Sequence, residues 1–403
     1  MKCIRRWSEK LNSGVHSKKP ADRGVRLKNS IPRFLLVSLF TLVTIEMALG
    51  DTPFLERFAT VTPASHYKSA IEQARQQIQV LMDSGAPGVS IAVGVDQTLI
   101  WAEGFGYADV EHRVPVTTLT KFRIGSVSKP MTSIAMALLY EQGVLDLDAP
   151  IQKYLTTFPV KEKGQVTLRL LASHRAGIRH YLPDGSDNFI TEHYDNVVDA
   201  LEVFSDDPLL FVPGEQYSYS SHGYNLISAV LQEASGQEFL ELMRDRVWGP
   251  LNLLNTVADH TDYIIEDRAA PYTRGPDGRL RNAPFVDNSY KWASGGFIST
   301  PSDLVRFGFG VFNSGIIKDE TLQLFLAPPR LPDGTVADQN YGLGWRGYGD
   351  DGAWIGHGGG SVGGNTYFAV HPEQNVVIAV TCNLTGCLGG NPSLSEIGQL
   401  FIN

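Results

Sequence analysis

Cysteine is scarce in this chain, and its cysteines are too few to form a network of disulfide bonds. Among 403 residues there are three, Cys3, Cys382 and Cys387, which excludes a disulfide-rich secreted scaffold. Cys382 and Cys387 could form a bridge in an oxidising compartment, but their spacing alone does not decide this. No group of residues has zinc-ligand spacing and His-Glu-x-x-His is absent, so we expect neither a metal ion nor another cofactor.

Excess positive charge is missing from the body of the chain. Residues 1–33 hold ten Lys and Arg against two acidic residues, whereas the chain after residue 50 holds 24 against 40, a net charge of −16. Because phosphate binding needs a positive surface, this balance excludes nucleic acid as a partner. Hydrophobic residues make up 43% and charged residues 19% of the chain, which is typical of a globular enzyme with a large core or two lobes.

A hydrophobic run of membrane-spanning length is lacking near the N-terminus. Residues 34–45 are uncharged and largely apolar, but these 12 residues fall short of the ~20 that a transmembrane helix needs. A basic region precedes them, and Ala48-Leu49-Gly50 follows with small residues at the two positions that a signal peptidase recognises. Residues 1–50 are therefore typical of an export signal, and we expect a periplasmic or secreted protein.

Two alternatives to export stay open for this leader. Residues 34–45 could remain in the chain as an anchor that tethers the protein to a membrane. Ile4, Trp7 and Leu11 would share one face of a helix surrounded by basic residues, and organelle transit peptides have this pattern. Import into an organelle is therefore the second alternative.

The remainder, residues 51–403, shows no internal repeat and no long linker, which indicates one folded body. Hydrophobic periodicity predicts helices at residues 66–84, 127–142, 301–313 and 392–402, and a mostly helical stretch with long loops at about residues 165–285. It predicts strands at residues 89–95 and 98–105 around a turn at Asp96-Gln97, and at residues 365–370 and 376–381. Strands near both ends predict an α/β (α+β) fold with one sheet built from both ends of the chain. We expect an α/β lobe at about residues 66–135 and 288–403, an inserted and mostly helical lobe at about 136–287, and a substrate cleft between them.

The tetrad Ser126-Val127-Ser128-Lys129 begins the second predicted helix. Residues three apart share a helix face, so the Lys129 amine can reach the Ser126 hydroxyl, whereas Ser128 faces elsewhere. A serine hydroxyl is a weak nucleophile until a base takes its proton, and a lysine with a lowered pKa can do this. The helix N-terminus adds partial positive charge where an oxyanion would form. Taken alone, however, the tetrad is better explained as a helix cap beside a solvated lysine.

Two further motifs carry residues suited to the same chemistry. Tyr219-Ser220-Ser221 precedes a predicted helix, and a tyrosine beside a lysine can shuttle protons because their ordinary pKa values nearly match. In His357-Gly358-Gly359-Gly360 the glycines let backbone amides approach a substrate and donate to an oxyanion. Structural packing of the tyrosine, or a glycine-rich turn with a satisfied histidine, would explain each motif alone.

One overlapping motif is misleading. Gly359-Gly360-Ser361-Val362-Gly363 matches the Gly-x-Ser-x-Gly elbow of α/β-hydrolases, which needs a strand before it and a helix after it. Here a strand is predicted to follow. After Ser361 the chain has no Asp, and His371 is its one His, so the order Ser, Asp, His cannot be completed. We therefore reject Ser361 as the nucleophile.

The three motifs at Ser126, Tyr219 and His357, in this order, resemble the serine β-lactamase and penicillin-binding-protein superfamily over about residues 66–400. The resemblance is strongest to the class C-related branch, which holds D-Ala-D-Ala carboxypeptidases, family VIII esterases and the mitochondrial serine β-lactamase-like protein. Residues 145–150, 170–181 and 286–297 look closest to the last of these. The resemblance implies a β-lactamase/transpeptidase-like fold, whose antiparallel sheet is flanked by helices.

In those stretches, three aromatic residues could be mistaken for catalysts. We expect His174 and His180 to hold loops, and Trp292 to form part of the core or of the cleft wall.

By this resemblance, Ser126 would attack a carbonyl group and form an acyl-enzyme, while Lys129 and Tyr219 handle the protons. The backbone amides of Ser126 and Gly360 would form the oxyanion hole. Water would then release the acyl group.

Two departures from the class C pattern bear on the substrate. Ser221 replaces an Asn that contacts the substrate amide and helps to place the lysine. His357-Gly358-Gly359 replaces Lys-Thr-Gly, so that the fixed positive charge for a β-lactam carboxylate becomes a titratable one. Both changes favour a small peptide or ester over a β-lactam as substrate.

The resemblance thus implies a serine peptidase, similar to D-Ala-D-Ala carboxypeptidases, or an esterase. A class C-like β-lactamase is one alternative. A non-catalytic, filament-forming scaffold with the same fold is another, and assembly into a homo-oligomer is left open.

Overall fold

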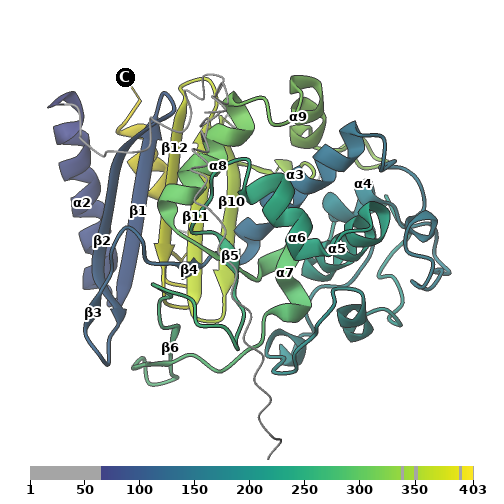
Figure 1. The fold of residues 1–403 in the computed structure, drawn as a ribbon, viewed down its shortest axis with the longest axis horizontal. Helices are drawn as coiled ribbons and strands as arrows, with labels where there is room; N and C mark the ends of the chain where they lie inside the picture. Colours follow the sequence, from purple (N-terminus) through teal and green to yellow (C-terminus); the bar gives the residue numbers. More distant parts are fainter. Residues whose placement is uncertain (1–64, 337–339, 349–352, 390–392, 403) are drawn as a thin grey trace, which may run out of the picture. The chain divides into compact units, whose positions relative to one another are not determined.

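The computed structural model describes residues 65–336, 340–348, 353–389 and 393–402. The expected leader, residues 1–50, lies outside these described residues, with its apolar stretch and its small-residue site. Within the described part, an antiparallel sheet is packed between helices (Figure 1), which confirms the expected fold class. None of the described helices is long and apolar enough to cross a membrane.

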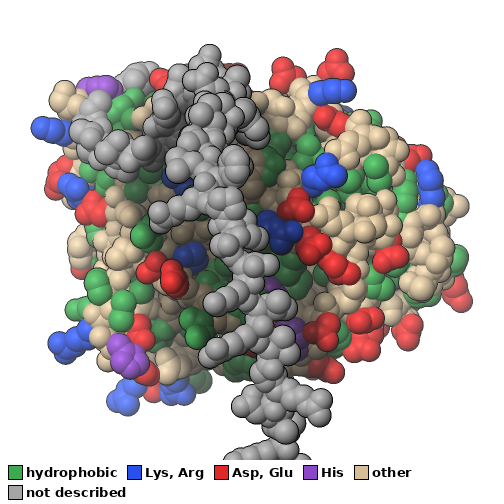
Figure 2. Space-filling view, viewed as in Figure 1, with side chains coloured by type: hydrophobic (Ala, Val, Ile, Leu, Met, Phe, Trp, Pro, Cys, Tyr) green, Lys and Arg blue, Asp and Glu red, His purple; other side chains and the backbone are tan. Residues whose placement is uncertain are grey.

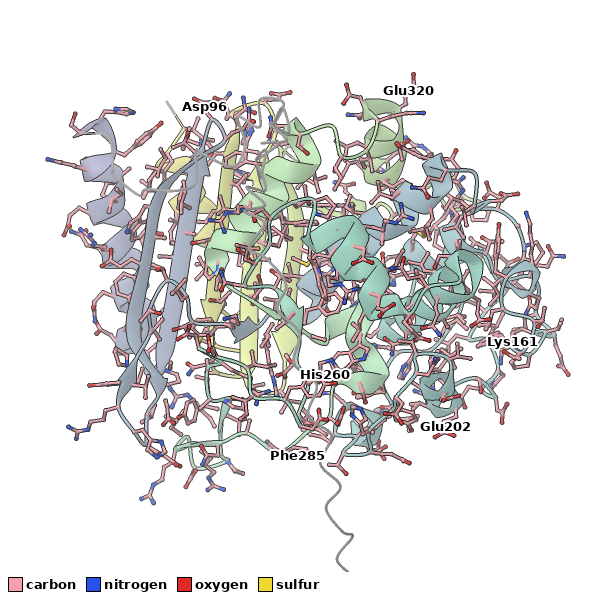
Figure 3. All side chains as sticks on the ribbon, viewed as in Figure 1. Asp96, Lys161, Glu202, His260, Phe285 and Glu320 are labelled. Atoms are coloured by element: carbon pink, nitrogen blue, oxygen red, sulfur yellow. A yellow bond between two sulfur atoms is a disulfide. The ribbon has the colours of Figure 1, made fainter. Side chains whose placement is uncertain are left out.

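The central sheet contains seven strands among the described residues, in the order β3-β2-β1-β12-β11-β10-β9, and each is antiparallel to its neighbours. These strands are β1 (Gly88–Val95), β2 (Thr98–Asp109), β3 (Val114–Pro115), β9 (Arg346–Tyr348), β10 (Trp354–Ser361), β11 (Gly364–His371) and β12 (Val376–Cys382). Asp96 and Gln97 form the turn between β1 and β2, and both have positive φ, as tight two-residue hairpins require. The predicted turn is confirmed, and Figure 3 shows Asp96 at the end of this hairpin.

Strands from both ends of the chain meet in the middle of the sheet. β1 pairs with β12, with Ala92 opposite Ala379, which confirms the predicted sheet built from both ends. Successive side chains of a strand point to opposite faces. Ile91 and Val93 therefore join one hydrophobic core, and Ala92 joins the other. Both faces of β1 are buried because helices cover both sides of the sheet.

Three helices cover the two faces of the sheet (Figure 1). α2 (Lys68–Asp83) and α10 (Ser393–Gln399) pack on one face, and α8 (Pro301–Asn313) packs on the other. The helical spacing that predicts α2 corresponds to its buried residues, which are Ala70, Ile71, Ala74, Ile78 and Leu81. α8 begins where predicted, because the Thr300 hydroxyl accepts a hydrogen bond from the Asp303 amide and caps the helix.

The other helices lie beside the sheet. The α-helices are α3 (Ser128–Glu141), α4 (Leu168–Ala172), α5 (Ser221–Ser235), α6 (Phe239–Met243), α7 (Trp292–Gly295) and α9 (Asp319–Leu326). Short helical turns are η1 (Ser65–Tyr67), η2 (Gly125–Val127), η3 (Ile151–Lys153), η4 (Ser186–Asn188), η5 (Asp199–Val203), η6 (Arg244–Trp248) and η7 (Ser289–Lys291). Acidic side chains are spread over the half of the visible face that carries α4, α5 and α6 (Figure 2), as the negative charge of the body leads us to expect.

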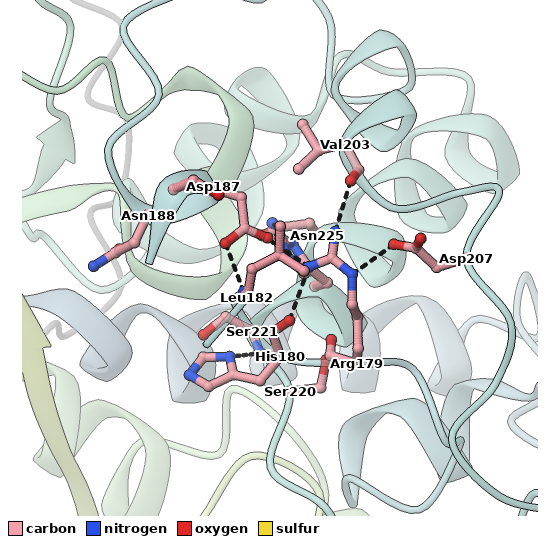
Figure 4. A network of polar contacts seen from close by, with 12 residues as sticks. Arg179, His180, Leu182, Asp187, Asn188, Val203, Asp207, Ser220, Ser221 and Asn225 are labelled. Carbon is pink, nitrogen blue, oxygen red and sulfur yellow. Dashed lines mark hydrogen bonds and ion pairs between the residues drawn. The ribbon is translucent and has the colours of Figure 1, made fainter. Parts of the chain in front are cut away.

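Residues 165–285 are less helical than predicted. Within this fully described stretch the α-helices are α4, α5 and α6. It also contributes strand β5 (Val257–Ala258), which joins β4 (Phe122–Arg123) and β8 (Phe297–Ser299), and the hairpin of β6 (Tyr272–Arg274) and β7 (Leu280–Asn282). The prediction fails here because this stretch is held by polar contacts between loops. It does not rely on helices with a periodic apolar face. Arg179, for example, forms ion pairs with both Asp187 and Asp207 (Figure 4).

Candidate active site

Ser126 lies in η2, directly before α3. Gly125 before it has a φ of +51°, a conformation that favours glycine, and a Cβ there would lie 2.5 Å from the Gly360 carbonyl oxygen. Val127 occupies the N-cap position of α3 and no side chain caps this helix. Ser126 is therefore not the helix cap that the tetrad alone suggests, and it lines a cavity instead.

Lys129 is fully buried in the first turn of α3. Its Nζ lies 3.0 Å from Ser126 Oγ, 3.2 Å from Ser221 Oγ and 2.7 Å from the carbonyl oxygen of Ser294. These three partners come from η2, α5 and α7, so the tertiary structure fixes the amine beside the Ser126 hydroxyl.

The surroundings of Lys129 favour a neutral amine. Burial is the main cause that lowers the pKa of Lys129 well below its usual value, and the nearby cations Lys291 and Arg346 lower it further. A neutral amine has two N–H donors and one lone pair. Because the Ser294 carbonyl can only accept a hydrogen bond, one donor points there, and the lone pair is free to take the Ser126 proton.

Tyr219 lies directly before α5, whose N-terminus the Ser220 side chain caps. Its hydroxyl is hydrogen-bonded to Ser126, and the centroid of its ring is 4.9 Å from Lys129 Nζ. Burial raises the pKa of Tyr219 above its usual value, whereas that of Lys129 falls. The matched pair expected from ordinary pKa values is therefore split, and the geometry suits Lys129 as a base and Tyr219 as an acid.

Two histidines hold the segment that carries Tyr219. His174 Nδ1 accepts a hydrogen bond from the Ser220 amide at 3.1 Å, and His180 Nδ1 accepts one from the Ser221 amide at 3.1 Å. Burial lowers the pKa of His180 to about 4 and that of His174 well below its usual value, so both rings can accept at neutral pH. These contacts are those of loop-holding residues.

The His357-Gly358-Gly359-Gly360 motif lies within strand β10, which the sequence analysis missed because glycine is uncommon in strands. A Cβ on Gly359 would lie 1.9 Å from the Ile124 carbonyl oxygen and 3.2 Å from the Ser126 amide nitrogen. A Cβ on Gly360 would meet nothing within 4 Å, because this residue borders the cavity. The absence of side chains thus lets β10 lie against η2, where the Gly360 amide is next to the Ser126 turn.

His357 does not supply the titratable charge expected of it. Its Nδ1 lies 2.6 Å from the Gly358 carbonyl oxygen, which can only accept, so Nδ1 carries the proton and Nε2 accepts from the Tyr341 hydroxyl at 2.9 Å. Burial, with repulsion from Lys129, lowers the pKa of His357 well below its usual value. The ring is neutral at neutral pH, and it lies outside the cavity lining together with Gly358 and Gly359.

A cavity of about 530 Å³ opens beside Ser126. The lining residues come from both sides of the cleft and are Ser126, His180, Tyr181, Asn188, Phe189, Tyr219, Ser221, Thr273, Pro284, Lys291, Ser294, Gly295, Gly360, Ser361, Val362, Asn365, Thr385 and Gly386. Ser361 is among them, but its Oγ has no hydrogen-bond partner among the described residues. In the described part of the chain no basic side chain forms a hydrogen bond with Ser361, and strand β11, not a helix, comes directly after it. The rejected elbow motif therefore lacks the helix that it needs.

Sequence comparison agrees with this arrangement of a serine, a buried lysine and a glycine strand. A β-lactamase family model matches residues 71–392. The chain belongs to the β-lactamase family. It is 32% identical over 446 aligned positions to the mitochondrial serine β-lactamase-like protein LACTB of Bos taurus, covering 83% of this chain and 80% of that protein.

Two solved structures show how widely this β-lactamase-family fold occurs. The octameric penicillin-binding protein homologue of Pyrococcus abyssi is 26% identical with a TM-score of 0.68, covering 80% of this chain and 78% of that one. EstCE1, a hydrolase with promiscuous acyltransferase activity, is 20% identical with a TM-score of 0.70, covering 84% of this chain and all of that one. EstCE1 therefore supports the β-lactamase-like fold and nothing finer.

A disulfide closes the loop behind the β-lactamase-like site. Cys382, at the end of β12, is bonded to Cys387, a pairing that the sequence left open. The Leu388 amide donates to Asn365 Oδ1, and Asn365 Nδ2 donates to the Gly359 carbonyl oxygen. The bridged loop is thereby linked to the glycine strand of the site.

Several residues of the site were missed by the sequence analysis. Ser294 acts through its backbone carbonyl, which no side-chain motif reveals. Lys291 and Asn365 line the cavity, but a single lysine or asparagine gives no signal in a sequence. Lys291 does lie in residues 286–297, one of the stretches that carry the family resemblance.

Proposed function

We propose that the protein is a serine hydrolase that acts through an acyl-enzyme on Ser126 and cleaves small peptides or esters. The observation that carries this proposal is the 3.0 Å contact between Ser126 Oγ and the buried Lys129 Nζ. A buried amine with a lowered pKa can activate a serine without a histidine. Membership of the β-lactamase family supports the same chemistry.

In the acylation step, the Ser126 oxygen attacks the substrate carbonyl carbon while its proton passes to the neutral Lys129 amine. The carbonyl oxygen becomes an oxyanion that accepts hydrogen bonds from the backbone amides of Ser126 and Gly360. Tyr219 then gives its proton to the leaving oxygen or nitrogen, and Lys129 returns the proton to the phenol. The bond to the leaving group breaks and leaves an ester on Ser126.

In the deacylation step, water attacks this ester and the neutral Lys129 amine takes one proton from the water. The oxyanion is held by the same two amides, and the proton then returns to the Ser126 oxygen as the acid departs. Ser221, whose Oγ lies 3.2 Å from Lys129 Nζ, takes over the placing of the lysine that an Asn performs in class C β-lactamases.

The lack of charge next to the glycine strand supports the substrate class that we propose. His357 stands where a lysine would bind a β-lactam carboxylate, and it is buried and neutral. A β-lactam would find no positive charge at that position. We therefore place peptides, with a D-Ala-D-Ala carboxypeptidase-like activity, and esters ahead of β-lactams, and a class C-like β-lactamase stays the alternative.

Acylation by a fluorophosphonate probe tests the nucleophile. The wild-type protein should become labelled and the Ser126→Ala protein should not. Ser361→Ala is the matched control, because Ser361 lines the same cavity, and it should be labelled like the wild type. Label that persists on the Ser126→Ala protein would refute the assignment.

A substrate panel then separates the activities. Short-chain p-nitrophenyl esters, D-Ala-D-Ala peptides and nitrocefin are offered to the wild type and to Ser126→Ala. We expect turnover of esters or peptides that is lost with Ser126. Turnover of nitrocefin at a comparable kcat/KM would favour the β-lactamase alternative.

Assembly is a second property that one comparison favours. The Pyrococcus abyssi homologue is described as octameric, and we propose that this chain also forms a homo-oligomer. Sedimentation of the wild-type and Ser126→Ala proteins tests this apart from turnover. Equal association of both would show that assembly does not depend on acylation, whereas monomers at all concentrations would refute the proposal.

The leader and the relatives together support a proposal for the compartment. The LACTB relatives are mitochondrial by name, which favours organelle import over export. The Cys382–Cys387 bond suits any oxidising compartment. We propose that residues 1–50 carry the targeting information. A reporter fused to these residues should reach an organelle or be exported, and a reporter that stays in the cytosol would contradict both.

A further inference from the structure

The cavity beside Ser126 contains one charged side chain with no assigned task. Among the described residues that line it, Lys291 is the one Lys, Arg, Asp or Glu. His180 also lines the cavity, but its Nδ1 accepts the Ser221 amide hydrogen bond, so it is neutral. His357 is neutral too and lies outside the lining. The positive charge that a substrate meets in this cavity is therefore that of Lys291.

Lys291 is fixed firmly in the site. It ends η7 and is followed directly by α7, the helix whose Ser294 carbonyl holds Lys129. Asp287 accepts a hydrogen bond from the Ser289 amide and so anchors the start of η7. The residue as a whole is 3% exposed, and the side chain still reaches the cavity.

The ammonium group of Lys291 is poorly satisfied by the protein. It has three N–H donors, and its described contacts are a 3.3 Å hydrogen bond to Asn188 Oδ1 and the faces of two aromatic rings. Its Nζ lies 4.9 Å from the ring centroid of Tyr290 and 5.7 Å from that of Tyr181. These contacts leave hydrogen-bonding capacity for an incoming oxygen.

The carboxylates whose charge reaches Lys291 are Asp187 and Asp259, and both are already engaged. Asp187 is ion-paired with Arg179, and Asp259 is ion-paired with Arg123. None of the described Asp or Glu side chains forms an ion pair with Lys291. Burial, with repulsion from Arg123, lowers the pKa of Lys291 to about 7 against the attraction of these two carboxylates. A buried cation without a counter-ion is costly, and an anionic ligand in the cavity would offset that cost and favour the ammonium form.

We propose that Lys291 recognises a carboxylate on the acyl portion of the substrate. This inference rests on the serine hydrolase function proposed above. The leaving group must reach the Tyr219 hydroxyl, and the Tyr219 ring packs against His174, His180 and His357. The described contacts of Lys291 include none of these histidines, although its neighbour Tyr181 packs against His180. Its other neighbours, Asn188 and Tyr290, lie on the side of Lys291 that we assign to the acyl portion.

The network in Figure 4 explains why this part of the wall is rigid. Arg179 pairs with Asp187, whose carboxylate also accepts the Leu182 amide hydrogen bond. Asn188 follows Asp187 directly, and His180 follows Arg179. The ion pair between Arg179 and Asp187 therefore positions two groups. They are the Asn188 side-chain amide that contacts Lys291 and the His180 ring that accepts the Ser221 amide hydrogen bond.

Matched substrates test the proposal. The p-nitrophenyl half-esters of adipic and pimelic acid carry a free carboxylate at the far end. In the matched neutral substrates, called half-amides here, the p-nitrophenyl ester is kept and a carboxamide of the same length replaces that carboxylate. We expect the wild type to prefer the charged members by about tenfold in kcat/KM, which is the size expected of a hydrogen bond to a charged group. Both substrates use the same Ser126 and Lys129, so their ratio cancels any effect on the catalytic base.

Two variants at the same position locate the preference. In Lys291→Met, which is similar in volume and uncharged, the ratio should fall to about one, and in Lys291→Arg it should be largely restored. Lys153→Met, on the exposed surface and outside the cavity lining, should keep the wild-type ratio. Equal kcat/KM for charged and neutral members in the wild type, or an unchanged ratio in Lys291→Met, would overturn the proposal.

A binding measurement keeps this test separate from the proposed function. On the Ser126→Ala protein, calorimetry compares binding of the charged half-ester with binding of the neutral half-amide. We expect Ser126→Ala to bind the charged half-ester more tightly than the neutral half-amide, and we expect Ser126→Ala/Lys291→Met to bind both equally. This result would support the role of Lys291 even if no substrate is turned over. Equal binding of both members by Ser126→Ala refutes it. Failure of probe labelling at Ser126 would refute the hydrolase function alone.

Discussion

The Lys129 amine lies 3.0 Å from the Ser126 hydroxyl and is held there by the carbonyl oxygen of Ser294. A protonated amine would have no lone pair for the serine proton. The structure removes that difficulty, because burial and neighbouring cations lower the pKa of Lys129. The proposed base therefore has a lowered pKa before a substrate arrives, without a histidine or carboxylate to activate it.

Replacing Lys129 by Arg keeps a positive charge at this position but removes the ability to accept a proton. The guanidinium group stays protonated at any working pH, so it cannot accept the Ser126 proton. We expect Lys129→Arg to lower kcat/KM for p-nitrophenyl esters by about 10²–10⁴-fold, the usual contribution of a general base. Lys129→Met should show a similar loss. Activity within threefold of the wild type in either variant, with unchanged thermal melting, would exclude Lys129 as the base.

The pH dependence of acylation should have an acid limb set by Lys129. Activity is lost as pH falls through its folded-state pKa, which lies well below the usual value. Lys291 is one of the cations that lower this pKa, so Lys291→Met should raise the pKa of Lys129 and shift the acid limb to higher pH. Profiles of kcat/KM for the neutral half-amides would measure this shift, and a shift to lower pH would contradict the assigned coupling.

Tyr219→Phe should affect substrates according to their leaving groups. The phenol hydroxyl, which keeps its proton because burial raises the pKa of Tyr219, is assigned to protonate the leaving atom. A nitrophenolate leaves without a proton, whereas an alkoxide or an amine needs one. The loss in kcat/KM should therefore be small for p-nitrophenyl esters and about 10²–10⁴-fold for methyl esters or peptides. An equal loss for both classes would point to a structural role.

Two neighbouring glycines of β10 form a matched pair for mutation. A Cβ on Gly359 would lie 1.9 Å from the Ile124 carbonyl oxygen, whereas the nearest atom to a Cβ on Gly358 would be the Tyr348 hydroxyl at 3.6 Å. Gly359→Ala should push the strand away from the Ser126 turn and lower kcat by at least tenfold. Gly358→Ala should be tolerated. Comparable activity of the two variants in an ester assay would exclude the close packing of β10 against η2.

Acid should destabilise the fold through His180. The unfolded ring takes up a proton below its ordinary pKa of about 6.5, whereas the folded ring does so below about 4. Between these values the unfolded state binds more protons, so the free energy of unfolding falls as pH falls. Thermal melting between pH 7 and 4 measures this, and the decrease should be smaller in His180→Gln. His112→Gln is the matched control at an exposed site. It should not make the decrease smaller, because the hydrogen bond to Asp109 raises the pKa of His112 and so acts with the opposite sign.

The elements with a regular apolar pattern were predictable from the sequence. Ile71, Ala74, Ile78 and Leu81 recur at helical spacing and form the buried face of α2. The turn at Asp96 separates two predicted strands, of which β1 starts one residue before its predicted bound and β2 continues four residues beyond its own, to Asp109. The strand that carries the glycines could not be found in this way. Glycine is required in this strand because the backbone of Ile124 lies against it. That contact joins distant parts of the chain, so no local pattern reveals it.

The site was predictable only where side-chain spacing is local. Ser126 and Lys129 are one turn apart, so their proximity follows from helix geometry alone. The neutrality of His357 depends on burial and on Tyr341, which no local pattern contains. The same holds for Lys291, whose neighbours Asn188 and Tyr181 are about a hundred residues away in the chain.

The pairing of β1 with β12 has a consequence for how the protein comes into being. Ala92 and Ala379 are opposite each other although about 290 residues separate them. This pairing cannot form until nearly the whole chain has been made, and pairing over such a separation is slow. Ser126 leaves the ribosome long before β10 and β12. A growing chain therefore carries Ser126 without the glycine strand that would complete the proposed oxyanion hole. On the proposed function, activity towards acyl groups can begin only when synthesis is nearly finished.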